Sequence, residues 1–166
     1  MKHTLPYEST GSAIIGYRES VIAKRETNDC VVRAFASSFG VTYDFAHKFV
    51  ENEFKRKPRC GTFFTISKMC RLHDESIEVN GKKVYPLGVP SKSIASPFTL
   101  DYQVKVKGEM VKRQMTVGTF VKQNPKGSYF VVVKGHAFTI KDGVVVGNLE
   151  DSIKLKRPIR AAFEIK

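Results

Sequence analysis

The residue whose type and position most favour chemistry is Cys30, which follows Thr27-Asn28-Asp29 and precedes an apolar segment that stops at Gly40. Thr, Asn and Asp are typical of helix N-termini and Gly of the position after a helix, so the sequence predicts a helix with Cys30 in its first turn. Free amides and the helix dipole stabilise negative charge there. A thiol at that place has a lowered pKa and is a candidate nucleophile. The alternative is a buried cysteine that only packs.

A second candidate is His136, in Gly135-His136-Ala137, which lies between two segments rich in β-branched and aromatic residues. The pattern predicts that His136 begins a strand and that Asp142-Gly143 forms the two-residue turn of a β-hairpin. A histidine in this position could act as a general base. The alternative is a core histidine with a satisfied hydrogen bond.

Asn148 ends the strand that returns from this turn. We expect the hairpin to bring Asn148 beside His136, where it would hold the imidazole in the tautomer that can take a proton from Cys30. Glu150 and Asp151 follow closely and remain alternatives for this third position.

The order Cys30, His136, Asn148, with helices first and strands later, resembles the papain-like cysteine peptidase superfamily. Asn28-Asp29-Cys30 and Gly135-His136-Ala137 are most similar to its compact members, which include bacteriocin-processing peptidases and short proteins of tailed phages. The phage-like resemblance extends over residues 27–148, including 43–46 and 126–129.

The resemblance implies roles for each residue: Cys30 as nucleophile, His136 as base and acid, and Asn148 as the group that orients the ring. The implied activity is hydrolysis of an amide, peptide or isopeptide bond of a protein or peptide substrate through an acyl-enzyme. A transferase would use the same thioester and differ only in the group that attacks it. No cofactor and no metal are implied.

The expected oxyanion donors are the backbone amide of Cys30 and the side chain of Asn28. Papain-like enzymes usually carry a Gln five or six residues before the nucleophile to complete this site. Here Lys24 and Arg25 occupy those positions, and no Gln precedes Cys30. Asn28 is therefore the candidate replacement.

The elements that must position these residues form an α+β pattern. Apolar spacing predicts helices over residues 30–39, over 43–54 and from near 62 to 72, and a short helix over 116–121. Alternating or continuous apolar segments predict strands at 102–107, 129–133, 137–140, 144–146 and 161–165. We expect one papain-like domain over 1–166, in which a helical part (27–75) follows an N-terminal arm (1–26) and packs on a mostly antiparallel sheet part (80–166).

The chain is strongly basic, with 28 Lys and Arg against 16 Asp and Glu and a net charge of +12. Such a surface attracts polyanions and acidic proteins, or only keeps the protein in solution. The candidate partner surface consists of eight residues: Lys55, Arg56, Lys57, Arg59, Lys154, Lys156, Arg157 and Arg160. The alternative function is a catalytically degenerate basic protein that binds nucleic acid or an acidic protein.

The remaining sequence features argue against a metal-binding protein, a membrane protein and a secreted protein. Cys60 and Cys70 are interpreted as packing residues, and no spacing of Cys, His or carboxylates predicts a metal site. No apolar segment is long enough to cross a membrane, and the N-terminus lacks an apolar signal core. We expect a cytoplasmic protein, in the host cytoplasm or associated with the virion if a phage encodes it. The oligomeric state is left open.

Overall fold

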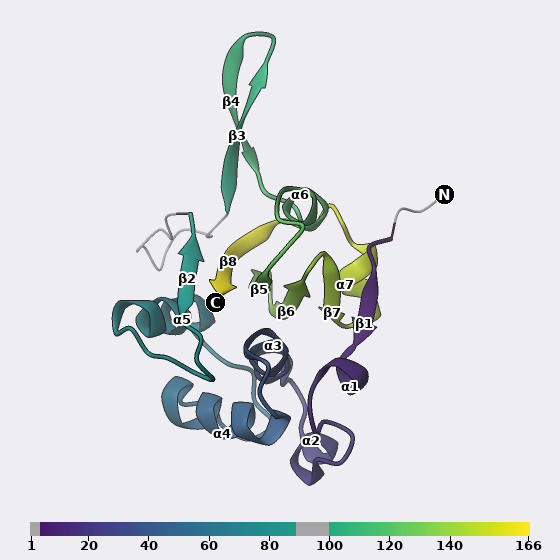
Figure 1. Ribbon diagram of the computed structural model, residues 1–166, viewed down its shortest axis with the longest axis vertical. Coiled ribbons are helices and arrows are strands. Elements are labelled where there is room, and N and C mark those ends of the chain that lie inside the picture. Colours follow the sequence, from purple (N-terminus) through teal and green to yellow (C-terminus); the bar gives the residue numbers. More distant parts are fainter. Residues whose placement is uncertain (1–3, 89–99) are drawn as a thin grey trace.

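The main sheet of the protein has six strands in the order β1-β7-β6-β5-β8-β2. The computed structural model describes residues 4–88 and 100–166 (Figure 1). The strands of this sheet are β1 (Tyr7–Ser9), β2 (Val84–Leu87), β5 (Ser128–Val133), β6 (His136–Lys141), β7 (Val144–Gly147) and β8 (Ile159–Ile165). β1 pairs in parallel with β7, and every other pairing in the sheet is antiparallel. The predicted α+β class with a mostly antiparallel sheet is confirmed.

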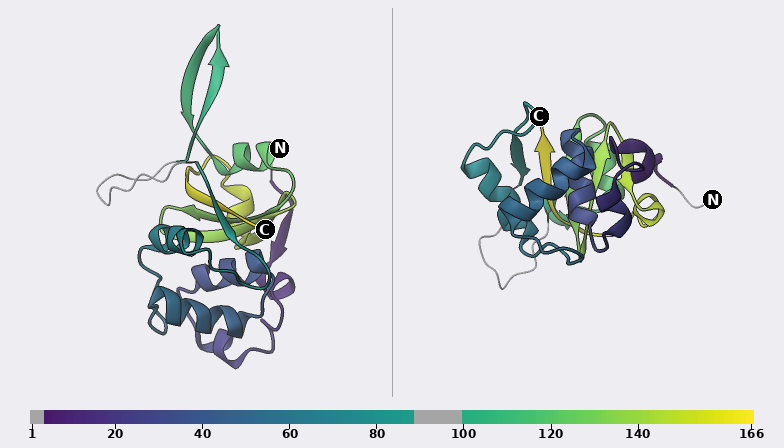
Figure 2. Two further views of the ribbon diagram at one scale, coloured as in Figure 1. Left: turned by 60° about the vertical axis from the view of Figure 1, so that its left-hand side comes forward. Right: turned by 90° about the horizontal axis from the view of Figure 1, so that it is seen from below.

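Helices lie on both faces of this sheet. They are α1 (Thr10–Ala13), α2 (Val21–Arg25), α3 (Cys30–Phe39), α4 (Tyr43–Phe54), α5 (Thr65–Asp74), α6 (Val117–Gln123) and α7 (Leu149–Ile153). Figures 1 and 2 show α1 to α5 below the sheet, with α3 between it and α4, and α6 on the opposite face.

The central helix α3 forms as the sequence predicts. It begins at Cys30 and ends at Gly40, whose φ of 70° is the left-handed conformation that glycine adopts without strain. Phe35 and Phe39 are fully buried, and each contributes roughly 2 kcal/mol of hydrophobic stabilisation. Thr139 of β6 ties the helix to the sheet, because its hydroxyl donates to the Ala34 carbonyl at 2.9 Å. The start of α3 is therefore fixed relative to β6.

Three elements differ from the expected ones. Residues 4–26 do not form a separate arm, because β1 extends the sheet edge and α1 and α2 join the helical layer. Helix α5 begins at Thr65, since Phe64 adopts a left-handed φ of 54° and is 68% exposed. The strands β3 (Asp101–Val106) and β4 (Glu109–Gln114) form a separate two-stranded sheet that projects from the domain in Figure 1.

Within the described parts of the chain, no helix combines the length and apolar character that a membrane span requires.

Candidate active site

Cys30 is the first residue of α3 and is half-buried. Its position is set by the preceding Asp29, a buried residue whose carboxylate accepts a hydrogen bond from the Tyr43 hydroxyl at 2.7 Å. The same carboxylate lies 3.1 Å from Nε of Arg33, one turn further along the helix. Burial and the hydrogen bond to Asp29 raise the pKa of Tyr43 above its ordinary value, so this tyrosine stays a hydrogen-bond donor. Helix α3 is therefore anchored at the residue next to the thiol.

A buried ion-pair cluster holds the chain that leads to Cys30. The carboxylate of Glu26 accepts hydrogen bonds from Arg56 at 2.7 Å and from the backbone amide of Arg59 at 3.0 Å. His47 contacts the other carboxylate oxygen at 2.9 Å. Burial raises the pKa of Glu26, but the bonds from Arg56 and His47 outweigh it and lower that pKa to about 2. This cluster fixes the entrance to α3 against α4.

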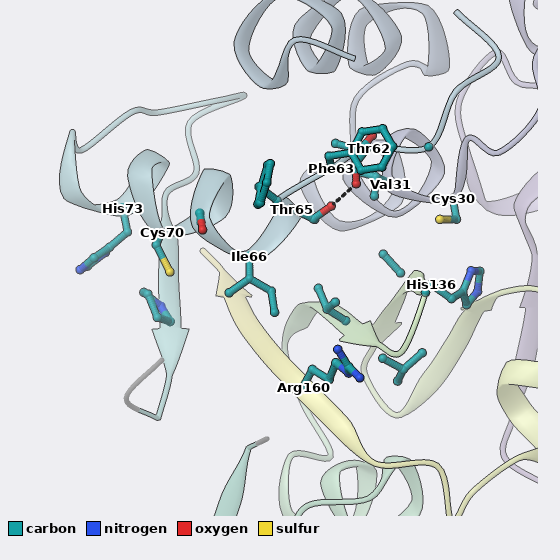
Figure 3. A pocket seen from close by; sticks show the side chains of 18 of the residues that line it. Cys30, Val31, Thr62, Phe63, Thr65, Ile66, Cys70, His73, His136 and Arg160 are labelled. Carbon is teal, nitrogen blue, oxygen red and sulfur yellow. Dashed lines mark hydrogen bonds between the residues drawn. The ribbon is translucent and has the colours of Figure 1, made fainter. Parts of the chain in front are cut away.

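His136 is the first residue of β6, and its ring stacks on Phe138 with the centroids 6.0 Å apart. Nε2 of His136 lies 3.0 Å from Oδ2 of Asp151 in α7. Because Nε2 is engaged there, Nδ1 is the ring nitrogen left for the thiol of Cys30. Figure 3 shows the sulfur of Cys30 and the ring of His136 together at one end of a cavity. The two candidate residues, far apart in the sequence, are thus brought together.

The prediction that Asn148 orients the imidazole is corrected by the structure, which places Asp151 in that position. The register of β6 and β7 pairs Lys141 with Val144 and Thr139 with Val146. Continued along the chain, this register places Asn148 opposite Ala137, one residue away from His136. The Asn148 side chain instead accepts a hydrogen bond from Arg33 at 3.1 Å.

The carboxylate of Asp151 contacts three partners. It is 1% exposed, and besides His136 it binds the Asn148 backbone amide at 2.8 Å and Arg157 at 2.6 Å. The bond to Asn148 is the helix-capping contact at the start of α7. The spacing of Asn148 and Asp151, with an acidic side chain three residues after a helix-capping residue, is the sequence signal that could have identified this residue.

The pKa values of the three groups shift in the directions that favour an ion pair. Burial raises the pKa of the Cys30 thiol, but interactions with the His136 imidazole and the Ala137 amide outweigh it, and the pKa is lowered. Burial lowers the pKa of His136, yet the bonds with Asp151 and Cys30 raise it to about 9. The pKa of Asp151 is lowered, because the bonds from His136 and Arg157 outweigh its burial. The lowered pKa of Cys30 and the raised pKa of His136 both favour a thiolate beside an imidazolium.

A cavity of about 1060 Å³ opens beside the thiol. Cys30 and His136 line one end, and Cys70 and His73 line the other (Figure 3). The wall between them is largely apolar, with Ile66, Val132 and Val133, the side chains of Phe63 and Phe64 at the rim, and the guanidinium of Arg160. Cavities of this size and composition hold small molecules or short peptide segments.

The structure does not bring Asn28 to this cavity. Asn28 adopts a left-handed φ of 53°, is exposed, and its Nδ2 donates to the Arg59 carbonyl at 3.3 Å. Its expected role as oxyanion donor is therefore not supported by its position. The Cys30 amide, at the start of α3, has no intrahelical acceptor and remains the oxyanion donor that the helix supplies.

The eight residues of the expected basic surface divide into two groups. Five are exposed: Lys55, Lys57, Arg59, Lys154 and Lys156. The other three are not free surface charges. Arg56 is 4% exposed and pairs with Glu26, Arg157 binds Asp151 and covers the Phe138 ring, and Arg160 lines the cavity. Two of these cations therefore pair with interior carboxylates, and the third lies in the cavity wall.

The other thiols differ from Cys30. Cys60 is exposed, so the expectation that it packs in the core is wrong. Cys70 is half-buried, and burial raises its pKa. Among the described residues, no group of three or more His, Cys, Asp or Glu side chains is arranged to hold a metal ion.

Comparison of the chain with protein-family models, with curated proteins and with solved structures finds no match.

Proposed function

We propose that this protein is a papain-like cysteine hydrolase that cleaves an amide, peptide or isopeptide bond of a protein or peptide. The observation that carries the proposal is the chain of contacts from the Cys30 thiol through His136 to buried Asp151, with the thiol opening into a cavity. A thiol, an imidazole and a carboxylate in this order constitute an activated nucleophile.

In the first half of the proposed reaction, the Cys30 thiolate attacks the carbonyl carbon of the scissile amide. The negative charge that forms on the carbonyl oxygen is stabilised by the Cys30 amide and by the dipole of α3. Nδ1–H of the His136 imidazolium gives its proton to the amide nitrogen, the C–N bond breaks, and the amine leaves. The acyl group remains on Cys30 as a thioester.

In the second half, neutral His136 takes a proton from a water molecule as that water attacks the thioester carbonyl. The C–S bond breaks, the carboxylic acid leaves, and the thiolate and imidazolium are restored. Asp151 keeps its negative charge throughout. Its bonds to Arg157 and to the Asn148 amide hold it in place, so it orients the ring and stabilises the imidazolium.

Two features favour this function over a basic binding protein. A protein that bound polyanions through its surface would gain nothing from the lowered pKa of Cys30 or from the buried carboxylate behind His136. The exposed cations Lys55, Lys57 and Arg59 lie on the chain segment between α4 and the cavity residues 61–67, where they would recruit an acidic protein substrate.

The test is labelling with a peptidyl chloromethyl ketone, followed by peptide mapping with mass spectrometry. We expect labelling of Cys30, its loss in Cys30→Ala and its reduction in His136→Ala. Cys70→Ser is the matched control, because Cys70 lines the same cavity but its pKa is raised by burial, and it should label like the wild type. Equal labelling of Cys30→Ala with retained fold would contradict the proposal. Products formed with and without added amines separate hydrolysis from transfer.

A further inference from the structure

The cavity wall contains one permanent cation, Arg160 of β8, among the lining residues that the structure describes. Arg160 lies between the end with Cys30 and His136 and the end with Cys70 and His73 in Figure 3. The other lining residues near it, Val132, Val133 and Ile66, are apolar.

The direction of this side chain is the result of a β-bulge. Val132 pairs with Ala161 and Val133 pairs with Ile159, so Arg160 is the extra residue between two consecutive pairs. Strict alternation would place Arg160 on the face of Ala162, which packs in the cluster beneath α6. The bulge interrupts the alternation, and Arg160 lines the cavity instead.

Arg160 also differs from the other arginines that are not fully exposed. Arg33, Arg56, Arg71 and Arg157 each pair with a carboxylate. Arg160 is half-buried, yet in residues 4–88 and 100–166 it has no ion pair. The sequence of residues 1–3 and 89–99 contains no Asp or Glu. Asp74, a carboxylate that lines the same cavity, forms no ion pair with Arg160.

A half-buried guanidinium without an anion has lost part of its hydration and gained no charged partner, so a ligand carboxylate that docks on it forms a bidentate, charge-assisted contact. We propose that Arg160 binds a carboxylate of the peptide substrate and makes the enzyme selective for acidic peptides. This inference rests on the proposed hydrolase function, whose substrate class it specifies.

The sheet geometry limits where that carboxylate lies along the substrate. Val133 of β5 pairs with His136 on one side and with Ile159, the neighbour of Arg160, on the other. The backbones of β6 and β8 are therefore two strand spacings apart, about 10 Å. An extended peptide covers about 3.3–3.6 Å per residue, so the carboxylate is expected about two or three residues from the scissile bond. It belongs either to an Asp or Glu side chain or to a C-terminus.

The experiment uses internally quenched peptides in which Glu is moved through each position on both sides of the scissile bond, with Gln at the same positions as the neutral series. Each peptide is made with a free and with an amidated C-terminus, which separates a side-chain carboxylate from a terminal one. We expect kcat/KM to be about 10- to 100-fold higher for one acidic position, and the preference to disappear in Arg160→Gln. Arg113→Gln removes a positive charge from the projecting β4 strand and is the matched control.

Three further measurements make the outcome decisive. Arg160→Lys should keep part of the preference, and Arg160→Glu should transfer it to peptides with Lys at the same position. The rate of Cys30 alkylation by iodoacetamide, measured in parallel in His136→Ala, reports on the thiol–imidazole pair separately from the peptide preference. Equal kcat/KM for the Glu and Gln series, or a preference that survives in Arg160→Gln, would overturn the proposal.

Failure of the hydrolase proposal can be told apart from failure of this one. Binding of the same fluorescent peptides to Cys30→Ala, measured by anisotropy, requires no catalysis. Tighter binding of an acidic peptide that is lost in the Cys30→Ala, Arg160→Gln double variant supports the carboxylate site even if no peptide is cleaved. Equal binding of acidic and neutral peptides by Cys30→Ala counts against it.

Discussion

Nε2 of His136 lies 3.0 Å from Oδ2 of Asp151, a carboxylate that also binds Arg157 at 2.6 Å and the Asn148 amide at 2.8 Å. Asp151 therefore orients the imidazole, and Arg157 and the Asn148 amide in turn hold Asp151 in place. Asn148 contributes its backbone to this arrangement, while its side chain contacts Arg33.

Asp151→Asn should lower the pKa of His136 from about 9 towards its ordinary value, because the amide removes the charge that stabilises the imidazolium. Activity should fall by about 100-fold. Stability should fall by about 3 kcal/mol, since Arg157 loses its buried partner. NMR titration of the imidazole protons, urea unfolding and kcat/KM measure the three effects. Asn148→Ala is the control, with near wild-type activity. The reverse ranking of the two variants would show that Asn148 is the orienting residue.

The pH dependence of Cys30 alkylation should follow the ion pair. The lowered pKa of Cys30 keeps the thiolate populated at pH values below its ordinary titration range. Hydrolysis should decline in acid as Cys30 is protonated, and in base as His136 loses its proton with a pKa of about 9. Cys70, whose pKa is raised, should react only at higher pH. Peptide mapping after timed iodoacetamide treatment measures both thiols in one sample, and identical pH profiles would argue against an activated Cys30.

Gly147→Ala should disturb Asp151 directly. A Cβ at this position would lie 2.7 Å from Oδ2 of Asp151, which is closer than real contacts allow, and 3.0 Å from Cβ of Phe138, which is unusually tight. We expect a loss of stability of about 1–3 kcal/mol and a loss of activity larger than the unfolded fraction explains. Thermal unfolding and kcat/KM provide the comparison. Gly11→Ala is the control, because the nearest atom to its added Cβ is at 3.5 Å. Wild-type activity in a folded Gly147→Ala would mean that Asp151 does not need its present position.

Arg56→Met should destabilise the protein by about 3–5 kcal/mol, because it leaves the Glu26 carboxylate buried without its main partner. The pKa of Glu26 is lowered to about 2, so its contribution to stability is present above its ordinary pKa of 4.5 and is lost as the pH falls towards about 2. Urea unfolding at several pH values between 2 and 7 should show this loss in the wild type and a weaker pH dependence in Arg56→Met.

The pair formed by Arg71 and Glu53 serves as the matched control for that experiment. Both side chains are about 40% exposed, so Arg71→Met should cost less than about 1 kcal/mol. Similar losses in the two arginine variants would contradict the assigned role of the Glu26 cluster at the entrance to α3.

The parts of the site that depend on local sequence are the parts that sequence analysis predicts. Thr27-Asn28-Asp29 before Cys30 indicates a helix start, and Gly135-His136 between two apolar segments indicates a strand start; both elements form as expected. The functional roles assigned to Cys30 and His136 stay predictions.

The parts that depend on pairing register and bulges could not be read from composition alone. The register of β6 and β7, continued along the chain, places Asn148 opposite Ala137 and not opposite His136, and the first turn of α7 brings Asp151 to the ring. The bulge at Arg160 reverses the face expected from alternation. The three-residue strand β1 is too short to show a period of two.

Because Cys30 belongs to the helical half and His136 with Asp151 to the second half of the chain, the reactive pair cannot exist during early translation. A nascent chain that has exposed only residues 1–75 carries a thiol without an imidazole partner from β6 and without the carboxylate of α7. In the proposed hydrolase, the activated thiol can therefore form only after β6 and α7 have been synthesised and have folded against α3.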